Sequence, residues 1–315
     1  MLQILPFTQK DKRKAFGTPL YVPYEHLKLK FIDMKKTILI LLAANLAISV
    51  SSQDYIPTRE DINAFFTTKT LVVLPNNPLL EYNYVIKTVM KQEWEITDYD
   101  FISFKEFEEK RFDPKYSFLY MTQVSFEHDK TDAKYRFIHL SLGGDYFRMN
   151  QMPDIASVPV AYYNVEEENY GYKLGILVRF IQNHAKLIQE RPEIVSANVF
   201  KHYNDNIKDI KTKTLYILEN ELSKEINSAA RIKKNYPYKF RIVTKEEIEQ
   251  VIKDRDKNVV FLHKVGPEGT KLNARCYKVI IGAGDANFYY FNYHKIDNKH
   301  PDGFLEDDLK KLAKK

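Results

Sequence analysis

The sequence predicts an α/β protein built from two similar modules, each with a mixed sheet and helices mainly on one face. Three observations indicate this fold. β-rich runs alternate with segments of helical periodicity. Short peptides recur in the same order at offsets of 140 to 144 residues. Residues 53–315, which follow a predicted leader, are numerous enough for two small domains.

The repeat begins with the tetrapeptide Thr-Lys-Thr-Leu, which occurs at 68–71 and again at 212–215. Each copy opens an apolar run that is typical of a strand. Further matches follow in the same order: 102–107 with 242–248, 118–120 with 260–262, Gly144-Asp145 with Gly284-Asp285, and 162–164 with 290–292. We therefore expect one β-α-β-α-β-β-β-α unit at 53–190, a polar linker at 191–211, and a second unit at 212–315.

In the first copy, the β-rich run 70–74 predicts a strand, and Pro78 starts a helix through 79–91 with helical apolar spacing. Alternation over 94–102 predicts a second strand. Ser103 and Glu106 match a capping box that opens a short helix to 110. The unit then continues with a hairpin of strands 116–126 and 135–142, a strand at 159–164 and a helix at 172–188.

The second copy repeats this order. We expect strand 214–218, helix 221–234, strand 238–243, helix 245–253, strands 258–265 and 274–281, strand 287–293 and helix 303–313. Thr244 and Glu247 form the second capping box. The linker is rich in Asn, Asp and Lys.

A leader is predicted at 34–52. Met34 is followed by two lysines, a 14-residue apolar run at 37–50 and a small-residue end, which are the three parts of a secretory signal peptide. Cleavage is expected between Ser52 and Gln53. This localises the chain to the periplasm or outside the cell. The alternative is an uncleaved anchor through 37–52 in the inner membrane, although a spanning helix needs about 20 apolar residues.

The 33 residues before Met34 have no clear periodicity. We interpret residues 1–33 as an upstream extension with translation starting at Met34, or else as a cytoplasmic tail. The whole chain has a net charge of +6. Residues 1–52 hold eight basic and three acidic residues, so residues 53–315 are close to neutral. Long-range attraction to an acidic partner, and nucleic-acid binding in particular, is therefore not expected.

Two glycine-containing turns are the motif candidates. Residues 143–147 superficially resemble the signature of diguanylate cyclases, but Tyr146 stands where a second metal-binding carboxylate is required. We therefore interpret both segments as turns that end strands. Gly144 and Gly284 would allow a positive φ, and Asp145 and Asp285 would accept hydrogen bonds from nearby backbone N–H groups.

No catalytic, metal or cofactor site is predicted. The sequence has no Gly-x-Ser-x-Gly elbow and no phosphate-binding glycine loop with Lys-Ser/Thr. The histidines are scattered, and residues 127–129 are expected in a solvated hairpin turn. The single cysteine, Cys276, lies in an alternating strand and is interpreted as a small buried residue, with a Cys/His pair to His263 or His294 as the alternative.

Aromatic residues gather at 288–293. As a strand, this segment places Tyr289, Phe291 and Tyr293 on one face. If the sheet is covered on one side only, an open face of this kind suits the recognition of a protein or glycan. The alternative is that these are ordinary core and surface aromatics.

The opening strand Lys-Thr-Leu-Val-Val-Leu-Pro at 69–75, followed by a helix, a strand, a short helix and a hairpin, resembles a cell-envelope module. It is similar in topology to the N-terminal domain of the TolB propeller protein and to the periplasmic domains of curli-secretion lipoproteins and penicillin-binding-protein activators. The resemblance covers about 120 residues in each half. It implies a mostly non-catalytic protein-interaction domain and assigns no functional residue. The absence of a lipobox cysteine is a departure from the lipoproteins.

We therefore expect a pair of modules that binds an envelope or extracellular protein, with no nucleic-acid partner and membrane contact only through an uncleaved leader. One alternative is an envelope hydrolase with a site between the modules, using Asp145 and Asp285 or the glutamates at 166–168. The other is a signal-anchored structural protein.

Overall fold

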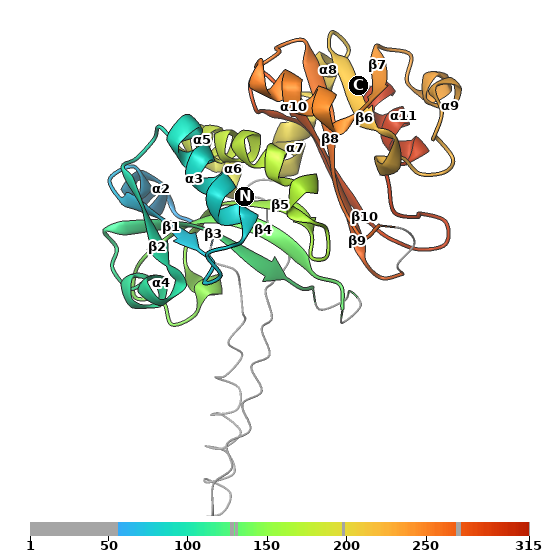
Figure 1. Ribbon diagram of the computed structural model, residues 1–315. Helices are drawn as coiled ribbons and strands as arrows, with labels where there is room; N and C mark the ends of the chain where they lie inside the picture. The colour runs from blue at the N-terminus through green and yellow to red at the C-terminus, as the bar shows by residue number, and fades with distance from the viewer. Residues whose placement is uncertain (1–55, 127–128, 130–131, 197–198, 269–271, 315) are drawn as a thin grey trace, which may run out of the picture.

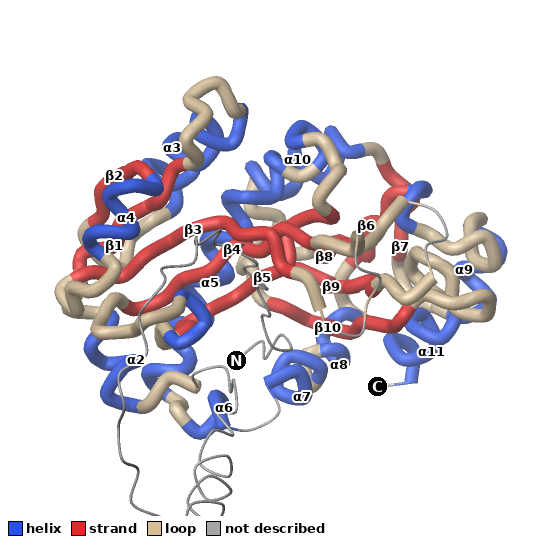
Figure 2. Tube along the Cα trace, turned by 90° about the horizontal axis from the view of Figure 1, so that it is seen from below, coloured by secondary structure: helices blue, strands red, loops and turns tan. Residues whose placement is uncertain are grey.

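The computed structural model describes residues 56–126, 129, 132–196, 199–268 and 272–314. It contains two five-stranded mixed sheets with helices around them (Figure 1), and the strands of both sheets run through the middle of the molecule (Figure 2). The predicted fold class is confirmed. The predicted leader and its cleavage site, Ser52 and Gln53, lie outside the described residues.

The first sheet has the strand order β2-β1-β3-β4-β5. Its elements, after a first helix α2 (Arg59–Phe65), are β1 (Lys69–Leu74), α3 (Glu81–Glu93), β2 (Tyr99–Ser103), α4 (Phe104–Lys110), β3 (Tyr116–Val124), β4 (Tyr135–Leu142), β5 (Asp154–Tyr162) and α5 (Leu174–Glu190). The two longest helices, α3 and α5, lie on one side of this sheet, and the short α4 lies on the other (Figure 1).

The second sheet has the order β10-β9-β8-β6-β7, which is the same order read from the other edge. Its elements are β6 (Thr214–Leu218), α9 (Ala229–Asn235), β7 (Phe240–Val243), α10 (Lys245–Lys253), β8 (Val259–Val265), β9 (Arg275–Gly282), β10 (Phe288–Lys295) and α11 (Glu306–Lys314). In both modules the first strand pairs in parallel with the second and third, and the last three strands are antiparallel.

The strand registers align the two modules residue by residue. Leu71 pairs with Phe118, and Leu215 pairs with Val260. Counting along β3 and β8 from these pairs makes Met121 equivalent to His263. Along the next strands, Val158 becomes equivalent to Phe291. The sequence match of 162–164 with 290–292 is therefore out of register, because β5 begins earlier than the predicted strand at 159–164.

The capping boxes form as predicted. Ser103 caps α4 together with Glu106, and Thr244 caps α10 together with Glu247.

Two expected elements differ. β2 starts at Tyr99 because Trp94 ends α3, and its indole Nε1–H donates to the Thr97 carbonyl oxygen at 3.1 Å.

The helix expected over 221–234 is replaced by a short 3-10 turn, η4 (Glu219–Glu221), and by α9. Leu222 forms a bridge with Phe304, and the Ser223 N–H donates to the Phe304 carbonyl oxygen. This pairing with a segment far along the chain holds residues 222 and 223 extended, and α9 begins only after Ser228, which caps it.

The expected linker is structured. It contains α6 (Glu193–Ser196), α7 (Val199–Asn204) and α8 (Ile207–Ile210). Asn204 both accepts a hydrogen bond from the Phe291 N–H and donates one to the Phe291 carbonyl oxygen, and Asn206 donates to the carbonyl oxygen of Phe288. These asparagines suggest a polar linker by composition. In the part of the chain that the structure describes, they form hydrogen bonds with backbone groups at the edge of β10 that no neighbouring strand pairs.

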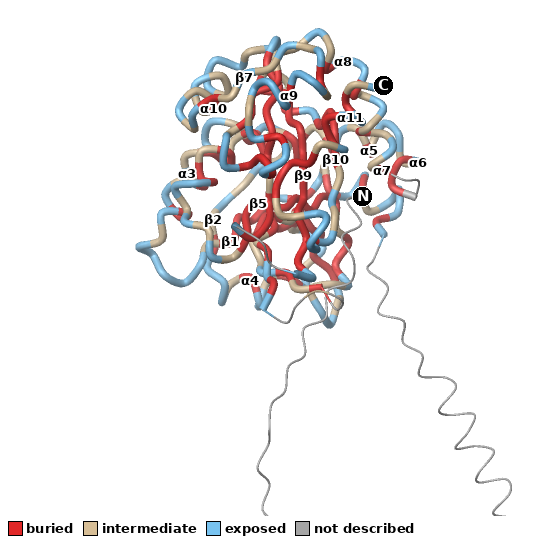
Figure 3. Tube along the Cα trace, turned by 90° about the vertical axis from the view of Figure 1, so that its right-hand side faces the viewer, coloured by how far each residue is buried: buried red, intermediate tan, exposed pale blue. Residues whose placement is uncertain are grey.

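One apolar core runs through both modules (Figure 3). It joins residues of α3, α5 and β3–β5 to residues of α10 and β8–β10. A buried ion pair lies between the modules, in which Arg275 Nε is 3.0 Å from an Asp129 carboxylate oxygen. The Arg275 backbone N–H donates to the hydroxyl oxygen of Tyr135. The two modules are therefore packed together over an extensive contact.

Among the described residues, no helix is both long enough and apolar enough to cross a bilayer.

Candidate functional site

A cavity lies between the two modules, and we call it the inter-module cleft. Its volume is about 1020 Å³. One wall comes from β5 and the segment after it (160–162, 165, 169, 170, 172 and 173). The other comes from the end of β6 (218–225), the start of α10 (243–245), the end of β8 (263–266 and 268) and the loop before α11 (298, 299, 301 and 302).

The connectivity of the second module explains why a cleft opens at this place. β6 pairs in parallel with β7 on one side and with β8 on the other. The connecting helices lie on opposite faces of the sheet, since Ile232 of α9 and Ile248 of α10 belong to different cores. At such a switch point the loops diverge beyond the carboxyl ends of the strands, and ligands of open α/β sheets bind there.

Lys173 and Glu221 meet at the floor of the cleft. Lys173 comes from the first module, and its Nζ lies 3.3 Å from Oε1 of Glu221, which follows β6 in the second. Both side chains are at least nine-tenths buried. Burial lowers the pKa of Lys173, but the Glu221 carboxylate and Tyr172 together outweigh burial and raise the pKa above its ordinary value, so the ammonium is retained.

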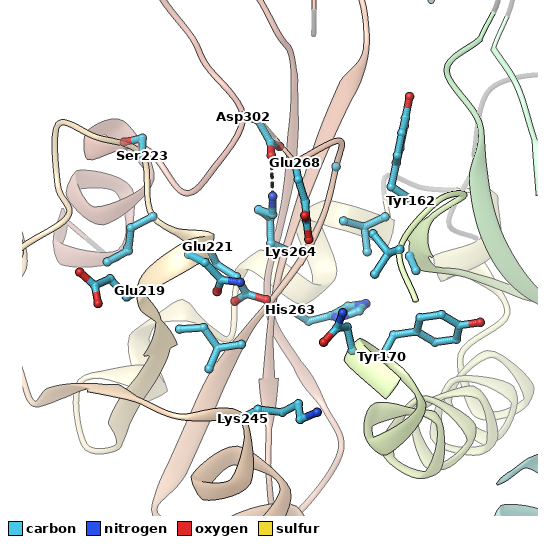
Figure 4. A pocket seen from close by; sticks show the side chains of 18 of the residues that line it. Tyr162, Tyr170, Glu219, Glu221, Ser223, Lys245, His263, Lys264, Glu268 and Asp302 are labelled. Atoms are coloured by element: carbon cyan, nitrogen blue, oxygen red, sulfur yellow. Dashed lines mark hydrogen bonds and ion pairs between the residues drawn. The ribbon is translucent and has the colours of Figure 1, made fainter. Parts of the chain in front are cut away.

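Lys264 and Asp302 form a second buried ion pair on the same side, with Lys264 Nζ 2.6 Å from Asp302 Oδ2 (Figure 4). Burial lowers the pKa of Lys264, but the charge and hydrogen bond of Asp302, together with Cys276 and Glu221, outweigh burial and raise the pKa, so the lysine stays protonated. Lys245 reaches across the cleft from α10, with its Nζ 3.4 Å from the Glu168 carbonyl oxygen. Each of these lysines thus has an acceptor.

His263 lies between Glu221 and Tyr170 in the cleft (Figure 4). Its Nε2 is 2.9 Å from the Pro159 carbonyl oxygen. Because a carbonyl only accepts hydrogen bonds, the imidazole proton is assigned to Nε2, which leaves Nδ1 as an acceptor. Burial, together with the charge of Lys173, lowers the pKa of His263 to about 3, so the ring is neutral at physiological pH.

Three buried acceptors in the cleft have no donor among the described residues. They are Oε2 of Glu221, Nδ1 of His263 and Oδ1 of Asp302. Buried polar atoms in native proteins are almost always hydrogen-bonded, because leaving one unpaired costs about 1–3 kcal/mol. All three side chains line the cleft, so a ligand held there can supply the missing donors.

The first module has a cavity at the equivalent place, and its character is different. It has a volume of about 260 Å³ and lies at the carboxyl ends of β1 and β3. In it, Met121 takes the position of His263 by strand register, and Phe104 takes that of Lys245 as the first residue of the capped helix. The same backbone arrangement thus carries apolar side chains at these two positions. The fold alone therefore does not require the polar groups that the second module has there.

The expectation of an open aromatic face on β10 is wrong for two of its three residues. Tyr289 and Phe291 are buried, and only Tyr293 is exposed, at 39%. The reason is that β10 is covered on both sides. Phe291 stacks on Phe200 of α7, whereas Tyr290, on the opposite face, donates a hydrogen bond to Asp308 of α11. The predicted placement of Tyr289 on the same face as Phe291 is also wrong, because the pairing of β10 shifts between Phe288 and Tyr290, and Tyr289 joins the core of Tyr290 rather than that of Phe291.

The turn interpretation is confirmed for Asp285, whose Oδ1 accepts a hydrogen bond from the Asn287 N–H at 3.0 Å. Gly284 precedes it in the turn between β9 and β10. Asp145 is exposed in the loop after Gly144, beyond the end of β4. Neither aspartate lines the inter-module cleft, so the structure does not place this pair in a shared site there.

The glutamates at 166–168 also have structural contacts. Glu167 accepts a hydrogen bond from the Tyr82 N–H at 2.8 Å near the start of α3. Glu168 lies 3.7 Å from Lys245 Nζ across the module boundary.

Asp129 and Cys276 are buried. The expectation of a solvated turn is wrong for Asp129, because its side chain is fully buried against Arg275. Residues 127 and 128 lie outside the described residues. Burial of Cys276 is confirmed, and it raises the pKa of the thiol to about 12. The thiol sulfur accepts a hydrogen bond from the Gly303 N–H. Within the described ranges, no group of three His, Cys, Asp or Glu side chains could hold a metal ion.

Sequence reasoning missed the residues that matter most in the cleft, namely Lys173, Glu221 and Lys264, and considered His263 only as a partner of Cys276. Lys173 and Glu221 are 48 positions apart and belong to different modules. The one available signal was the adjacent polar pair His263-Lys264 inside the otherwise apolar strand β8.

Comparison of the chain with protein-family models, with curated proteins and with solved structures finds no match.

Proposed function

We propose that this chain is a non-catalytic binding protein of the cell envelope or the extracellular space, and that it holds its ligand in the inter-module cleft. The observation that carries the proposal is the set of buried, unpartnered acceptors that line the cleft, namely Glu221 Oε2, His263 Nδ1 and Asp302 Oδ1. The envelope location rests on the predicted leader at 34–52 and on the resemblance to envelope modules.

The chemistry of the cleft favours binding over catalysis. Its lysines are charged and paired with carboxylates or carbonyls, whereas a nucleophilic lysine needs a lowered pKa. Neither carboxylate group that the hydrolase alternative requires lines the cleft. The sequence predicts a protein partner. Two of the three aromatic rings that were expected to contact such a partner are buried. A protein partner therefore remains in the proposal only if it carries the chemical group that binds in the cleft.

The proposal can be tested by blocking the cleft with one substitution. Asn220 lies at its exposed rim, directly after β6, and Asn76 occupies the equivalent place after β1, beside the smaller cavity. Asn220→Trp should fill the mouth of the cleft without disturbing a buried contact. Asn76→Trp is the matched control.

The measurement is amide NMR of the purified chain with six probes added in turn: cellobiose, maltose, N,N′-diacetylchitobiose, triglycine, spermidine and inorganic phosphate. We expect at least one probe to shift the amides of 218–223, 243–245 and 169–173. Asn220→Trp should abolish those shifts, and Asn76→Trp should leave them. If no probe shifts cleft amides, or if both variants respond like the parent chain, the proposed function is wrong.

A further inference from the structure

The walls of the inter-module cleft carry donors and acceptors side by side. Glu221 Oε2 and His263 Nδ1 are free acceptors. The ammonium of Lys173 touches the same Glu221 through Oε1, and its charge acts on His263. A ligand that reaches the free acceptors therefore also comes next to an ammonium group with further N–H donors.

A charged ligand group fits this wall poorly. A cation that donates to Glu221 Oε2 would lie close to Lys173, whose charge already neutralises that carboxylate. An anion that accepts from Lys173 would lie close to the Glu221 carboxylate. Like charges at such distances repel, and burial strengthens the repulsion because the local dielectric constant is low. A neutral group avoids both costs.

A hydroxyl group meets both requirements, since it donates one hydrogen bond and accepts others. Neighbouring hydroxyls can donate to Glu221 Oε2 and His263 Nδ1 while accepting from Lys173. Oδ1 of Asp302, another cleft residue, is a further acceptor for such hydroxyls, and this carboxylate lies beside the ammonium of Lys264 (Figure 4). The cavity volume of about 1020 Å³ exceeds what one sugar ring needs.

We infer that the inter-module cleft binds a neutral polyhydroxylated ligand, a carbohydrate of more than one ring, with Glu221, His263 and Asp302 accepting hydrogen bonds from its hydroxyls. This inference rests on the proposed binding function and names the ligand class for the same cleft. The first module, with Met121 and Phe104 at the equivalent positions, should not bind carbohydrate.

The test is calorimetric titration of the purified chain with cellobiose, maltose and N,N′-diacetylchitobiose. We expect at least one of them to bind, with an affinity that changes little between low and high salt, because a neutral ligand is not subject to screening. His263→Met should weaken this binding about tenfold, the effect of one lost hydrogen bond. It introduces the residue that the first module has at that position and leaves the Lys173–Glu221 ion pair in place.

Glu221→Gln is the second variant and should weaken binding by a similar factor, with the NMR spectrum confirming that the variant is folded. Asn76→Trp should bind as the parent chain does. Three results would overturn the inference. If triglycine, spermidine or phosphate binds in the cleft and no disaccharide does, the ligand class is wrong while the binding function stands. If a disaccharide binds but His263→Met and Glu221→Gln leave its affinity unchanged, the assigned contacts are wrong. If no probe binds, both the inference and the proposed function fail.

Discussion

At the scale of single residues, this protein retains several polar groups where a core would favour apolar ones. Lys278 and Asp308 are almost fully buried, 2.7 Å apart, and Tyr290 and Asn292 donate to the same carboxylate. These groups are tolerated because each of them is paired. Some buried polar atoms have no partner among the described residues, such as Nε2 of His184 and the Tyr236 hydroxyl, but these do not line the cleft. The unpaired acceptors of the cleft are therefore the candidate binding groups.

His263 makes the chain sensitive to acid. The pKa of its ring is about 3 in the folded chain, against about 6.5 for an exposed histidine. Between these values the unfolded chain binds more protons, so stability is present above about pH 6.5 and falls as the pH is lowered towards 3. The free energy of unfolding should decrease by about 2 kcal/mol from this residue between about pH 7 and about pH 5.

Urea denaturation at these two pH values, with the parent chain and with His263→Met, measures this contribution. The variant should lose less stability than the parent on acidification, although His184 and His294, whose pKa values burial also lowers, continue to contribute. Equal pH dependence of the two chains would show that His263 is already protonated or exposed.

At the scale of elements, the equivalent helices α4 and α10 start in the same way. In each, a hydroxyl accepts the N–H of the third helical residue, while the glutamate at that position accepts the N–H of the cap. The two modules share this capping box although their cavities differ. The reason is that the N-cap sets the residue at which the chain leaves the sheet and the helix begins.

Ser103→Ala and Thr244→Ala should each lower the free energy of unfolding by about 1 kcal/mol, the usual cost of losing a helix N-cap. Chemical denaturation of both variants gives the comparison directly. A loss at one cap that is several times larger than at the other would mean that one helix start carries a further contact beyond its capping box.

At the scale of the whole molecule, the two modules share one core and several polar contacts. Glu93 of α3 accepts from Arg255, which follows α10, and His263 contacts the Pro159 carbonyl oxygen of β5. The buried pair of Arg275 and Asp129 lies at the far end of the same boundary. A shared core predicts that the modules unfold together.

Differential scanning calorimetry should therefore show one transition for both modules. Arg275→Met leaves the Asp129 carboxylate buried without its partner, which should cost about 3–5 kcal/mol and shift the single transition downwards. The double variant Arg275→Met with Asp129→Leu should recover part of the loss, since no unpaired charge remains. Two separate transitions in the parent chain would contradict the shared core.

The sequence by itself determined the features that depend on neighbouring residues. Alternation, helical periodicity, the capping boxes at Ser103 and Thr244 and the turn at Asp285 each depend on residues a few positions apart, and the repeat lies in the order of such segments. For the same reason the linker at 191–211 could not be recognised as a cover for β10, because the Asn204 contacts reach 87 positions along the chain.

Only the tertiary structure decided which faces are buried and which polar groups meet. Tyr289 and Phe291 alternate like a half-exposed strand, but helices from distant segments cover both faces of β10. Lys173, Glu221 and His263 come from three separate segments and two modules, so no local pattern contains their cluster. Long-range packing brought them together in the cleft, because the parallel strands of the second module end there and the first module, which carries Lys173, closes the cleft from the other side.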